Sequence, residues 1–244
     1  MRLTEEIIKI KNLTKNVEGF LTDREGVLLY KLASKCSGKG VIVEIGSWKG
    51  KSTIWLAKGS KINKNIKIYA IDPHTGSQEH IQKYGNIWTF DEFKNNLKKA
   101  QVDDIVVPLV EYSHKAKELI KEPIELLFID GAHEYEAVKL DYELYFPLLI
   151  EGGFLIFHDT DREEVRLVAD RAFNSKYFKN VYFSDTITYG QKVKINSIKD
   201  KIKNNLMISL RNQFHFICSS HQRKFVKKFY KNFIKLCRNI IWIL

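Results

Sequence analysis

The stretch that most constrains the fold of this chain runs from residue 41 to residue 53 and reads VIVEIGSWKGKST. An apolar, β-branched run ends at Glu44, and Gly46 and Gly50 follow before a polar segment that is compatible with a helix. This order predicts a buried strand, a tight turn and the start of a helix. Gly46 can adopt a positive φ and would let a ligand approach the backbone closely. The spacing, Glu-x-Gly-x-x-x-Gly, is neither the dinucleotide motif nor a phosphate-binding loop.

Three later apolar runs also end in acids. They close with Asp72, with Asp130 and with the pair His158-Asp159. The carboxyl ends of the strands form the ligand-binding edge of an open α/β sheet, and an acid at the second strand end commonly accepts hydrogen bonds from ribose hydroxyls. The pattern therefore predicts a nucleoside-like ligand at this edge.

Strands alternate with helices along most of the chain, which predicts a doubly wound, Rossmann-like α/β sheet with right-handed crossovers. We expect about seven strands, mostly parallel, with the last one antiparallel after a short turn at 188–190. The expected strands are 41–46, 67–72, 105–111, 124–130, 153–158, 180–187 and 189–195. The expected helices are 3–16, a helix capped by Thr22 or Asp23 that runs to about residue 36, 50–59, 91–100, 114–121, 134–149 and 162–175.

Charge divides the chain unevenly. Of the net charge of +11, residues 197–244 carry +10, because they hold eleven Lys or Arg and one acid, Asp200. Residues 1–196 are nearly neutral. We therefore expect one sheet domain at 1–196 and a basic, partly amphipathic helical extension at 197–244.

The last 24 residues, 221–244, repeat aromatic and aliphatic side chains at helical spacing between Lys and Arg. This predicts a basic helix that lies on an anionic membrane surface. Two alternatives are a helix that packs on the core or on a second copy in a homo-oligomer, and nucleic-acid binding through the same charge. A nearly neutral domain argues against nucleic acid as the partner.

The N-terminal residues lack a signal-peptide pattern, and no apolar run is long enough to span a membrane. The three cysteines, Cys36, Cys218 and Cys237, are widely spaced, which is typical of reduced thiols. We expect a cytoplasmic protein, held at the inner face of the membrane if the tail binds there.

Taken in order, the four strand-end motifs resemble those of the class I S-adenosylmethionine-dependent methyltransferases. The resemblance is to the branch of sugar and small-molecule O-methyltransferases and cephalosporin-hydroxylase-like proteins, and it covers roughly residues 17–195. It implies S-adenosylmethionine as cofactor. The competing interpretation is a doubly wound domain that binds another nucleotide.

The resemblance also implies roles for the strand-end residues. Glu44 would hold the amino end of the cofactor, the turn 46–48 would wrap its methionine part, Asp72 would bind the ribose, and 111–113 would lie against the adenine. The full set of implied cofactor residues is Glu44, Gly46, Ser47, Trp48, Gly50, Asp72, Glu111, Ser113 and Asp130.

Methylation of a hydroxyl needs a general base, a metal or both, because a sugar or aliphatic hydroxyl is a poor nucleophile. Asp130 and Asp159 end adjacent strands and could bind Mg²⁺. His133 lies three residues after Asp130, and an imidazole, with an ordinary pKa near 6.5, suits a base. The resemblance implies that the first acid binds metal and that the histidine takes the proton. The expected catalytic residues are therefore His133, Asp130 and Asp159.

The chain departs from the family pattern at His158-Asp159, where Glu-Asp or Asp-Asn is common. His158 could join Asp130 and Asp159 as a ligand, including for a softer metal such as Mn²⁺ or Zn²⁺. It could equally pack as a hydrogen-bonded residue behind the site. The alternative is that no metal binds and the two acids only cap the end of the sheet.

A polar insertion at 74–90 follows the second strand, and loops at this edge commonly set specificity. We expect His74, Tyr84 and Trp88 to contact substrate, with the two aromatic rings stacked on a sugar. The alternative is a surface loop with Trp88 anchored in the core. The expected function is O-methylation of a sugar hydroxyl on a glycan or glycolipid precursor. The alternatives are a small-molecule or natural-product O-methyltransferase, an RNA methyltransferase and a non-catalytic membrane-tethering module.

Overall fold

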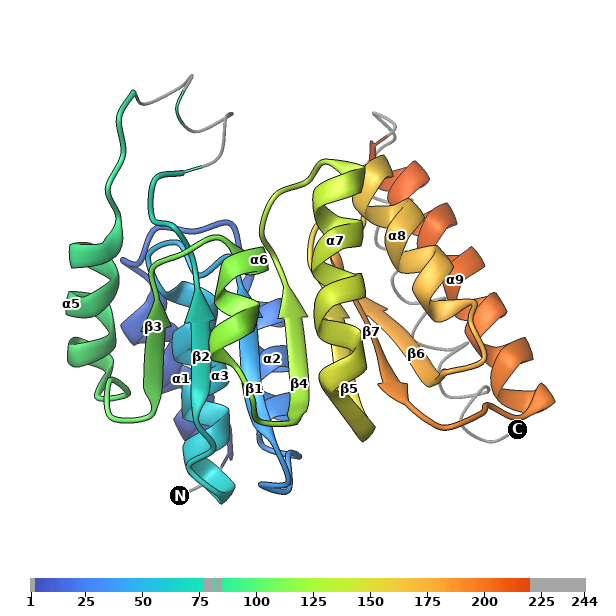
Figure 1. The fold of residues 1–244 in the computed structure, drawn as a ribbon, viewed down its shortest axis with the longest axis horizontal. Helices are drawn as coiled ribbons and strands as arrows, with labels where there is room; N and C mark the ends of the chain where they lie inside the picture. Colours follow the sequence, from blue (N-terminus) through green and yellow to red (C-terminus); the bar gives the residue numbers. More distant parts are fainter. Residues whose placement is uncertain (1–2, 77–80, 82–84, 220–244) are drawn as a thin grey trace.

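The computed structural model describes residues 3–76, 81 and 85–219. Its centre is a seven-stranded sheet in the order β3-β2-β1-β4-β5-β7-β6 (Figure 1). Strands β1 to β5 run parallel to one another, and β7 runs antiparallel to both β5 and β6. The doubly wound sheet with an antiparallel last strand is thus confirmed. The strands are β1 (Val41–Ile45), β2 (Ile68–Ile71), β3 (Val106–Leu109), β4 (Ile124–Ile129), β5 (Leu149–Phe157), β6 (Phe178–Ser184) and β7 (Ile187–Lys192).

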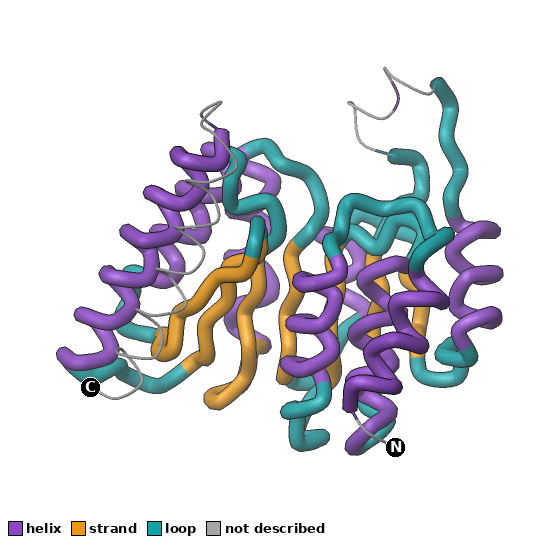
Figure 2. The backbone as a smooth tube through the Cα atoms, turned by 180° about the vertical axis from the view of Figure 1, so that it is seen from behind, coloured by secondary structure: helices purple, strands orange, loops and turns teal. Residues whose placement is uncertain are grey.

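Helices cover both faces of the sheet (Figure 2). One core cluster is buried under α1 (Leu3–Thr14), α2 (Asp23–Ala33), α3 (Lys51–Asn63) and α5 (Phe90–Ala100). The other is buried under α6 (Ser113–Ala116), η1 (Lys117–Leu119), α7 (Tyr135–Tyr145), η2 (Phe146–Leu148) and α8 (Glu163–Phe173). Because β1, β2 and β4 are buried on both faces, they read as apolar runs, which only Glu44 in β1 and Glu125 in β4 interrupt.

The helix predicted to start at Thr22 or Asp23 does so. Thr22 is the N-cap of α2: its side chain accepts a hydrogen bond from the Glu25 backbone N–H, and the Glu25 carboxylate accepts one from the Thr22 N–H. This capping box satisfies two donors that the first turn leaves without intrahelical partners. It also fixes the Glu25 side chain, which is fully buried.

Several predicted boundaries differ from the structure. The helix predicted at 114–121 is divided into α6 and η1. The one predicted at 134–149 ends at Tyr145, because Pro147 cannot donate the next helical hydrogen bond. Strand β5 then starts at Leu149 rather than at Gly153, and the glycines lie inside the strand. A Cβ on Gly153 would come within 2.9 Å of the Glu125 carbonyl oxygen, so the backbones of β4 and β5 need glycine there.

The final hairpin turns earlier than predicted. Thr188 and Gly190 lie within β7, and the turn falls at Asp185 and Thr186, with Asp185 at φ 48°. Asp tolerates this left-handed conformation well. Gly190 is instead needed because a Cβ there would lie 2.9 Å from the ring of Phe173.

The first half of the basic extension forms α9 (Ile198–Ser219), which packs on β6. Met207, Leu210 and Phe214 are buried with Phe183 of β6. The fully buried guanidinium of Arg211 pairs with Asp170 of α8 and donates to Thr188 Oγ1 over 3.1 Å. Residues 198–219 are therefore a packed part of the sheet domain.

Residues 221–244, to which we assign membrane binding, lie outside the described residues. Among the residues that are described, no helix is long and apolar enough to cross a membrane.

Candidate active site

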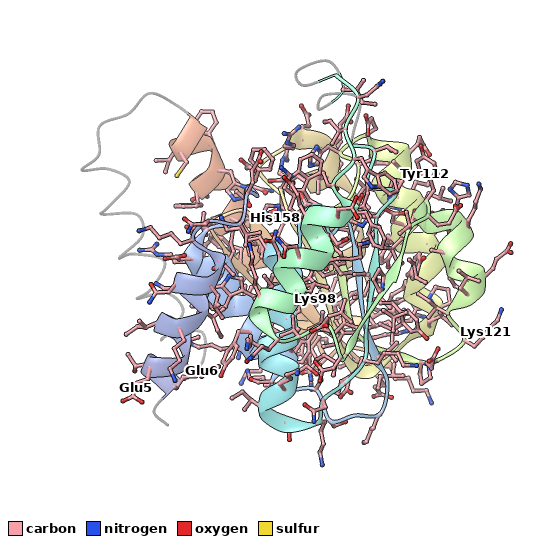
Figure 3. All side chains as sticks on the ribbon, turned by 90° about the vertical axis from the view of Figure 1, so that its left-hand side faces the viewer. Glu5, Glu6, Lys98, Tyr112, Lys121 and His158 are labelled. Atoms are coloured by element: carbon pink, nitrogen blue, oxygen red, sulfur yellow. The ribbon has the colours of Figure 1, made fainter. Side chains whose placement is uncertain are left out.

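A cavity of about 580 Å³ opens at the carboxyl ends of β1, β2, β4 and β5. This volume is within the range of cofactor and small-molecule sites. Its walls include residues 18–21 before α2, 45–48 after β1, 111–114 after β3 and 130–133 after β4. Figure 3 shows His158 and Tyr112 in the upper half of the molecule, where the carboxyl ends of these strands lie.

The β1 turn approaches the β4 turn closely. Gly46 has φ 87°, and a Cβ on it would lie 2.0 Å from the carbonyl oxygen of Asp130. The predicted positive φ is confirmed, but the missing side chain makes room for the neighbouring backbone rather than for a ligand. Ser47 and Trp48 follow on the cavity wall, and the Ser47 hydroxyl is buried without a hydrogen-bond partner within the described structure.

Asp72 holds two turns in place at the end of β2. Its Oδ2 accepts a hydrogen bond from the Trp48 backbone N–H and its Oδ1 one from the His74 N–H, both over 2.7 Å. The carboxylate also lines the cavity. It is thus pre-oriented in the position from which an acid accepts hydrogen bonds from ribose hydroxyls.

Two residues expected to bind cofactor do not line this cavity. Glu44 is fully buried and accepts a hydrogen bond from Thr53 on α3, and burial raises its pKa to about 8. A carboxyl group that is largely protonated at neutral pH is a poor partner for an ammonium. Gly50 caps α3 at φ 88° and faces Phe93 of α5. Both residues support the turn from behind.

The segment after β3 forms another part of the wall. Glu111, Tyr112 and Ser113 all line the cavity, as does Asp141 of α7. The Ser113 hydroxyl donates to Asp141 Oδ1, and the Tyr145 hydroxyl donates to the Ser113 carbonyl over 2.7 Å. Burial raises the pKa of Asp141 to about 6, against the opposing effect of its hydrogen bond from Ser113.

Neither of the described residues that were expected to contact substrate, His74 and Trp88, lines the cavity. His74 is fully buried, with Nδ1 2.8 Å from Thr89 Oγ1 and its ring against Phe90 and Phe93. Trp88 is 54% exposed, donates to Asp91 and does not line the cavity, so it is not a core anchor either. Tyr84 lies outside the described residues.

The predicted catalytic residues meet at the ends of β4 and β5. His133 Nε2 is 2.9 Å from Asp159 Oδ2. His158 Nδ1 is 2.9 Å from Asp130 Oδ1 and 3.3 Å from Asp159 Oδ1. Asp159 therefore faces one histidine with each oxygen, and all four side chains line the cavity.

Glu25 contacts this cluster from the far side. Its Oε2 is 3.6 Å from His158 Nε2, and its Oε1 accepts hydrogen bonds from the backbone N–H and the hydroxyl of Thr186. Burial acts to raise the pKa of Glu25, but His158, Thr22 and Thr186 outweigh it and lower the value to about 2. This carboxylate is therefore ionised at neutral pH.

Charges in the cluster are balanced by histidine. Burial acts to lower the pKa of His158, but the carboxylates of Asp130, Asp159 and Glu25 raise it well above its ordinary value. Burial also acts to raise the pKa of Asp159, yet hydrogen bonds from His133 and His158 hold it well below its usual range. Burial raises the pKa of Asp130 despite the opposing effect of His158.

Asp130, His158 and Asp159 could also hold a metal ion. One ligand atom from each lies within 4.8 Å of the others. Two carboxylate oxygens and an imidazole nitrogen suit Mn²⁺ or Zn²⁺. Nε2 of His158 faces Glu25, as a metal-binding histidine commonly donates its other N–H to a carboxylate. These three side chains fit such a metal ion, provided that Nδ1 of His158 loses its proton.

Sequence comparison agrees with this geometry. Residues 43–160 match the family described as "Methyltransferase domain". Just under half of the chain is thus similar to a methyltransferase domain. The match includes β1 to β5, and with them the acids at the ends of β2, β4 and β5.

Individual proteins are also similar to this chain in sequence or in structure. An uncharacterized protein, R132, of Acanthamoeba polyphaga mimivirus is 30% identical over 122 residues, which are 48% of this chain and 50% of that protein. The chain thus spans about half the length of this relative. The O-methyltransferase from Bacillus cereus in complex with SAH has a TM-score of 0.56 at 17% identity, covering 77% of this chain and 91% of that one.

A second solved structure is the O-methyltransferase TomG from Streptomyces achromogenes, in complex with SAM and involved in tomaymycin synthesis. It has a TM-score of 0.55 at 16% identity, and covers 78% of this chain and 90% of that one. At these identities the two structures show a shared methyltransferase fold.

Sequence analysis missed Glu25, Asp141 and the segment 18–21 as parts of the candidate site. Two of these could have been recognised from the sequence. Glu25 stands three residues after Thr22, as a capping box requires. Asp141 stands on the buried side of α7 with Val138 and Tyr145, where an acid is out of place unless it has a partner.

Proposed function

We propose that this protein is an S-adenosylmethionine-dependent O-methyltransferase that activates its acceptor hydroxyl with His133. The observation that carries the proposal is the His133–Asp159 pair on the wall of a cofactor-sized cavity. S-adenosylmethionine, when bound, supplies the electrophilic methyl group. The segments 46–48 and 111–113 and the carboxylate of Asp72 would hold it.

The contact between His133 and Asp159 suggests which ring nitrogen of His133 acts as the base. If the Nε2–H of His133 donates to Asp159 Oδ2, then Nδ1 is the nitrogen that can take the proton of the acceptor hydroxyl. Asp159 stays ionised because its pKa is held low, so it fixes the imidazole and stabilises the imidazolium that forms.

We propose that Asp130, His158 and Asp159 hold a divalent cation, Mg²⁺ or Mn²⁺. Beside the acceptor it would lower the pKa of the hydroxyl. Without it, Nδ1 of His158 contacts both aspartates directly. Both arrangements leave His133 as the base.

A sugar hydroxyl on a glycan or glycolipid precursor is the proposed acceptor. Phe20 supports this, because its ring is 71% exposed and lines the cavity, where it offers a surface on which a sugar can stack. It supplies the aromatic group that the insertion was expected to supply. A small-molecule or natural-product acceptor is the alternative.

A matched pair of variants tests the catalytic residues. His133→Ala should lower kcat by roughly 10²–10⁴-fold, the usual contribution of a general base, and leave the affinity for S-adenosylhomocysteine nearly unchanged. Asp159→Asn should also lower kcat, whereas Asp161→Asn, an exposed acid two residues away that does not line the cavity, should not. Full activity of the His133 variant would exclude it as the base.

Metal dependence is tested on the unmodified enzyme. Chelator should abolish methyl transfer, and Mg²⁺ or Mn²⁺ should restore it. Full activity in excess chelator would rule out the metal and leave the role of His133 intact. A panel of sugar and phenolic acceptors, followed by release of S-adenosylhomocysteine, decides the acceptor class.

We further propose that residues 221–244 bind an anionic membrane surface and bring the enzyme to a lipid-linked acceptor. A truncation after Ser219 keeps α9 whole. It should retain activity on a soluble acceptor but no longer float with anionic liposomes, and added salt should weaken flotation of the full chain. If the full chain does not float, the membrane proposal is wrong. If truncation changes the oligomeric state, the tail is a packing element.

A further inference from the structure

Helix α9 has two apolar faces, and only one of them is buried. Met207, Leu210 and Phe214 pack against β6 in the core. Because an α-helix turns once in 3.6 residues, side chains that are four residues apart lie on one side of it. The opposite side of α9 exposes three aliphatic side chains with this spacing, namely Ile198, Ile202 and Leu206.

These side chains lie at the edge of the molecule, where α9 is the outermost element beside α8 and β6 (Figure 1). Ile198 is 81% exposed, Ile202 is 64% exposed, and Ile195, which precedes the helix, is 67% exposed. With Leu206 they form what we call the α9 patch. A surface helix normally presents a polar face to water. A cluster of exposed aliphatic side chains therefore indicates that this face contacts a partner.

Basic side chains accompany the α9 patch. Four lysines, three of them exposed, alternate with its side chains along the sequence, namely Lys194, Lys199, Lys201 and Lys203. The only acid between residues 194 and 206 is Asp200, and its carboxylate accepts hydrogen bonds from the backbone N–H and the hydroxyl of Ser197 at the start of α9. The partner that fits this face is therefore both apolar and negatively charged.

Charge argues against two occupants from the protein itself. In a two-fold symmetric dimer, the α9 patch of one copy would face the same patch of the other, and the lysines would repel one another. Residues 221–244 carry seven Lys or Arg and no acid, so docking of this tail on the patch meets the same repulsion. An anionic membrane complements both features, because its headgroups attract the lysines and its acyl chains take up the aliphatic side chains.

We propose that the outer face of α9 lies on an anionic membrane, with the α9 patch inserted among the headgroups. This inference rests on the proposed membrane contact of residues 221–244, which follow α9 and supply most of the attraction. The patch adds a second contact, and this one is rigid. Because Met207, Leu210 and Phe214 fix α9 to the sheet, the patch sets the orientation in which the cavity meets a lipid-linked acceptor.

Flotation of the full chain with vesicles tests the inference. The vesicles contain phosphatidylcholine and phosphatidylserine, with phosphatidylcholine alone as the uncharged comparison. Ile198→Ser/Ile202→Ser should bind the anionic vesicles roughly 10–100-fold more weakly than the unmodified chain, the effect of two isoleucines that are each about half inserted. Because both side chains are exposed, the variant should keep its thermal unfolding midpoint and its affinity for S-adenosylhomocysteine.

Ile8→Ser/Ile62→Ser is the matched control. These two isoleucines are 52% and 58% exposed, and they lie on α1 and α3, away from α9 (Figure 1). The control should bind the vesicles as the unmodified chain does. Full binding by the α9 variant, or an equal loss in the control, would overturn the inference and leave residues 221–244 as the proposed membrane contact.

Lys199→Glu/Lys201→Glu tests the charge. This variant should bind anionic vesicles more weakly and with a smaller dependence on salt, because ions screen part of the attraction. Unchanged binding would show that the lysines face no headgroups and would overturn the inference. If the unmodified full chain does not float at all, both membrane proposals are wrong. Methyl transfer to a soluble acceptor, measured on the same preparation, tests the proposed enzymatic function separately.

Discussion

Alanine substitution at Gly46, with Gly152 as the comparison, measures how tightly the turn after β1 packs against the turn after β4. The two glycines have φ values of 87° and 86°, so alanine meets an unfavourable positive φ at either site. Their surroundings differ. No atom lies within 4 Å of a Cβ on Gly152, whereas a Cβ on Gly46 would be 2.0 Å from the carbonyl oxygen of Asp130 and 2.5 Å from its carbon.

The free energies follow from this difference. A left-handed conformation costs an alanine about 1–2 kcal/mol, and Gly152→Ala should lose only that amount of unfolding free energy. Gly46→Ala should lose roughly a further 1–3 kcal/mol of unfolding free energy, which is the range for overpacking. The loss should lie near the upper end of this range because the obstructing atoms belong to the backbone. The turn and Asp130 must separate, so cofactor affinity should fall as well.

Urea denaturation followed by circular dichroism gives both free energies, and calorimetry with S-adenosylhomocysteine gives the affinity. Equal losses of stability in the two variants would refute the reasoning, since φ alone would then account for both. A Gly46→Ala protein that keeps full affinity would show that the two turns can separate without disturbing the site.

Two other variants test the turn clamp and α9. Asp72→Ala removes the acceptor for the Trp48 and His74 N–H groups and for the ribose, so S-adenosylhomocysteine should bind about 10–100-fold more weakly by calorimetry; unchanged affinity would exclude Asp72 from the cofactor site. Asp170→Ala leaves the buried guanidinium of Arg211 without its carboxylate and should cost about 3–5 kcal/mol in urea denaturation. A loss well below that range would mean that α9 is not an integral part of the fold.

The strand-end acids made the fold predictable from sequence. Buried β-branched runs that each end in an acid indicate parallel strands whose carboxyl ends meet at one edge, and Asp72, Asp130 and Asp159 do line one cavity. The errors fall where a local pattern has two physical explanations. Gly190 suggested a turn, but it is a glycine because the ring of Phe173 packs against it.

Individual side chains were harder to place than strands. Successive residues of a strand point to opposite faces of the sheet, so the presence of Glu44 near the end of β1 did not reveal that its carboxyl group faces Thr53 on α3. His74 was expected to contact substrate because its segment is polar. Its burial depends on Phe90 and Phe93, and a window of sequence around His74 does not show that these rings will enclose it.

The position of His158 shows that the candidate catalytic site also depends on residues outside the segment that matches the methyltransferase family. Glu25 and Thr186 lie 161 residues apart, both outside residues 43–160, and they meet behind this histidine. Thr22 joins the same contact through its capping box and through a 3.1 Å hydrogen bond to Asp185. Because these bonds link α2 to the β6–β7 turn, the orientation of His158 toward Asp130 and Asp159 depends on the N-terminal helices and the last hairpin together. A chain reduced to the shared segment would keep the strand-end acids and lose the carboxylate that faces His158 from behind.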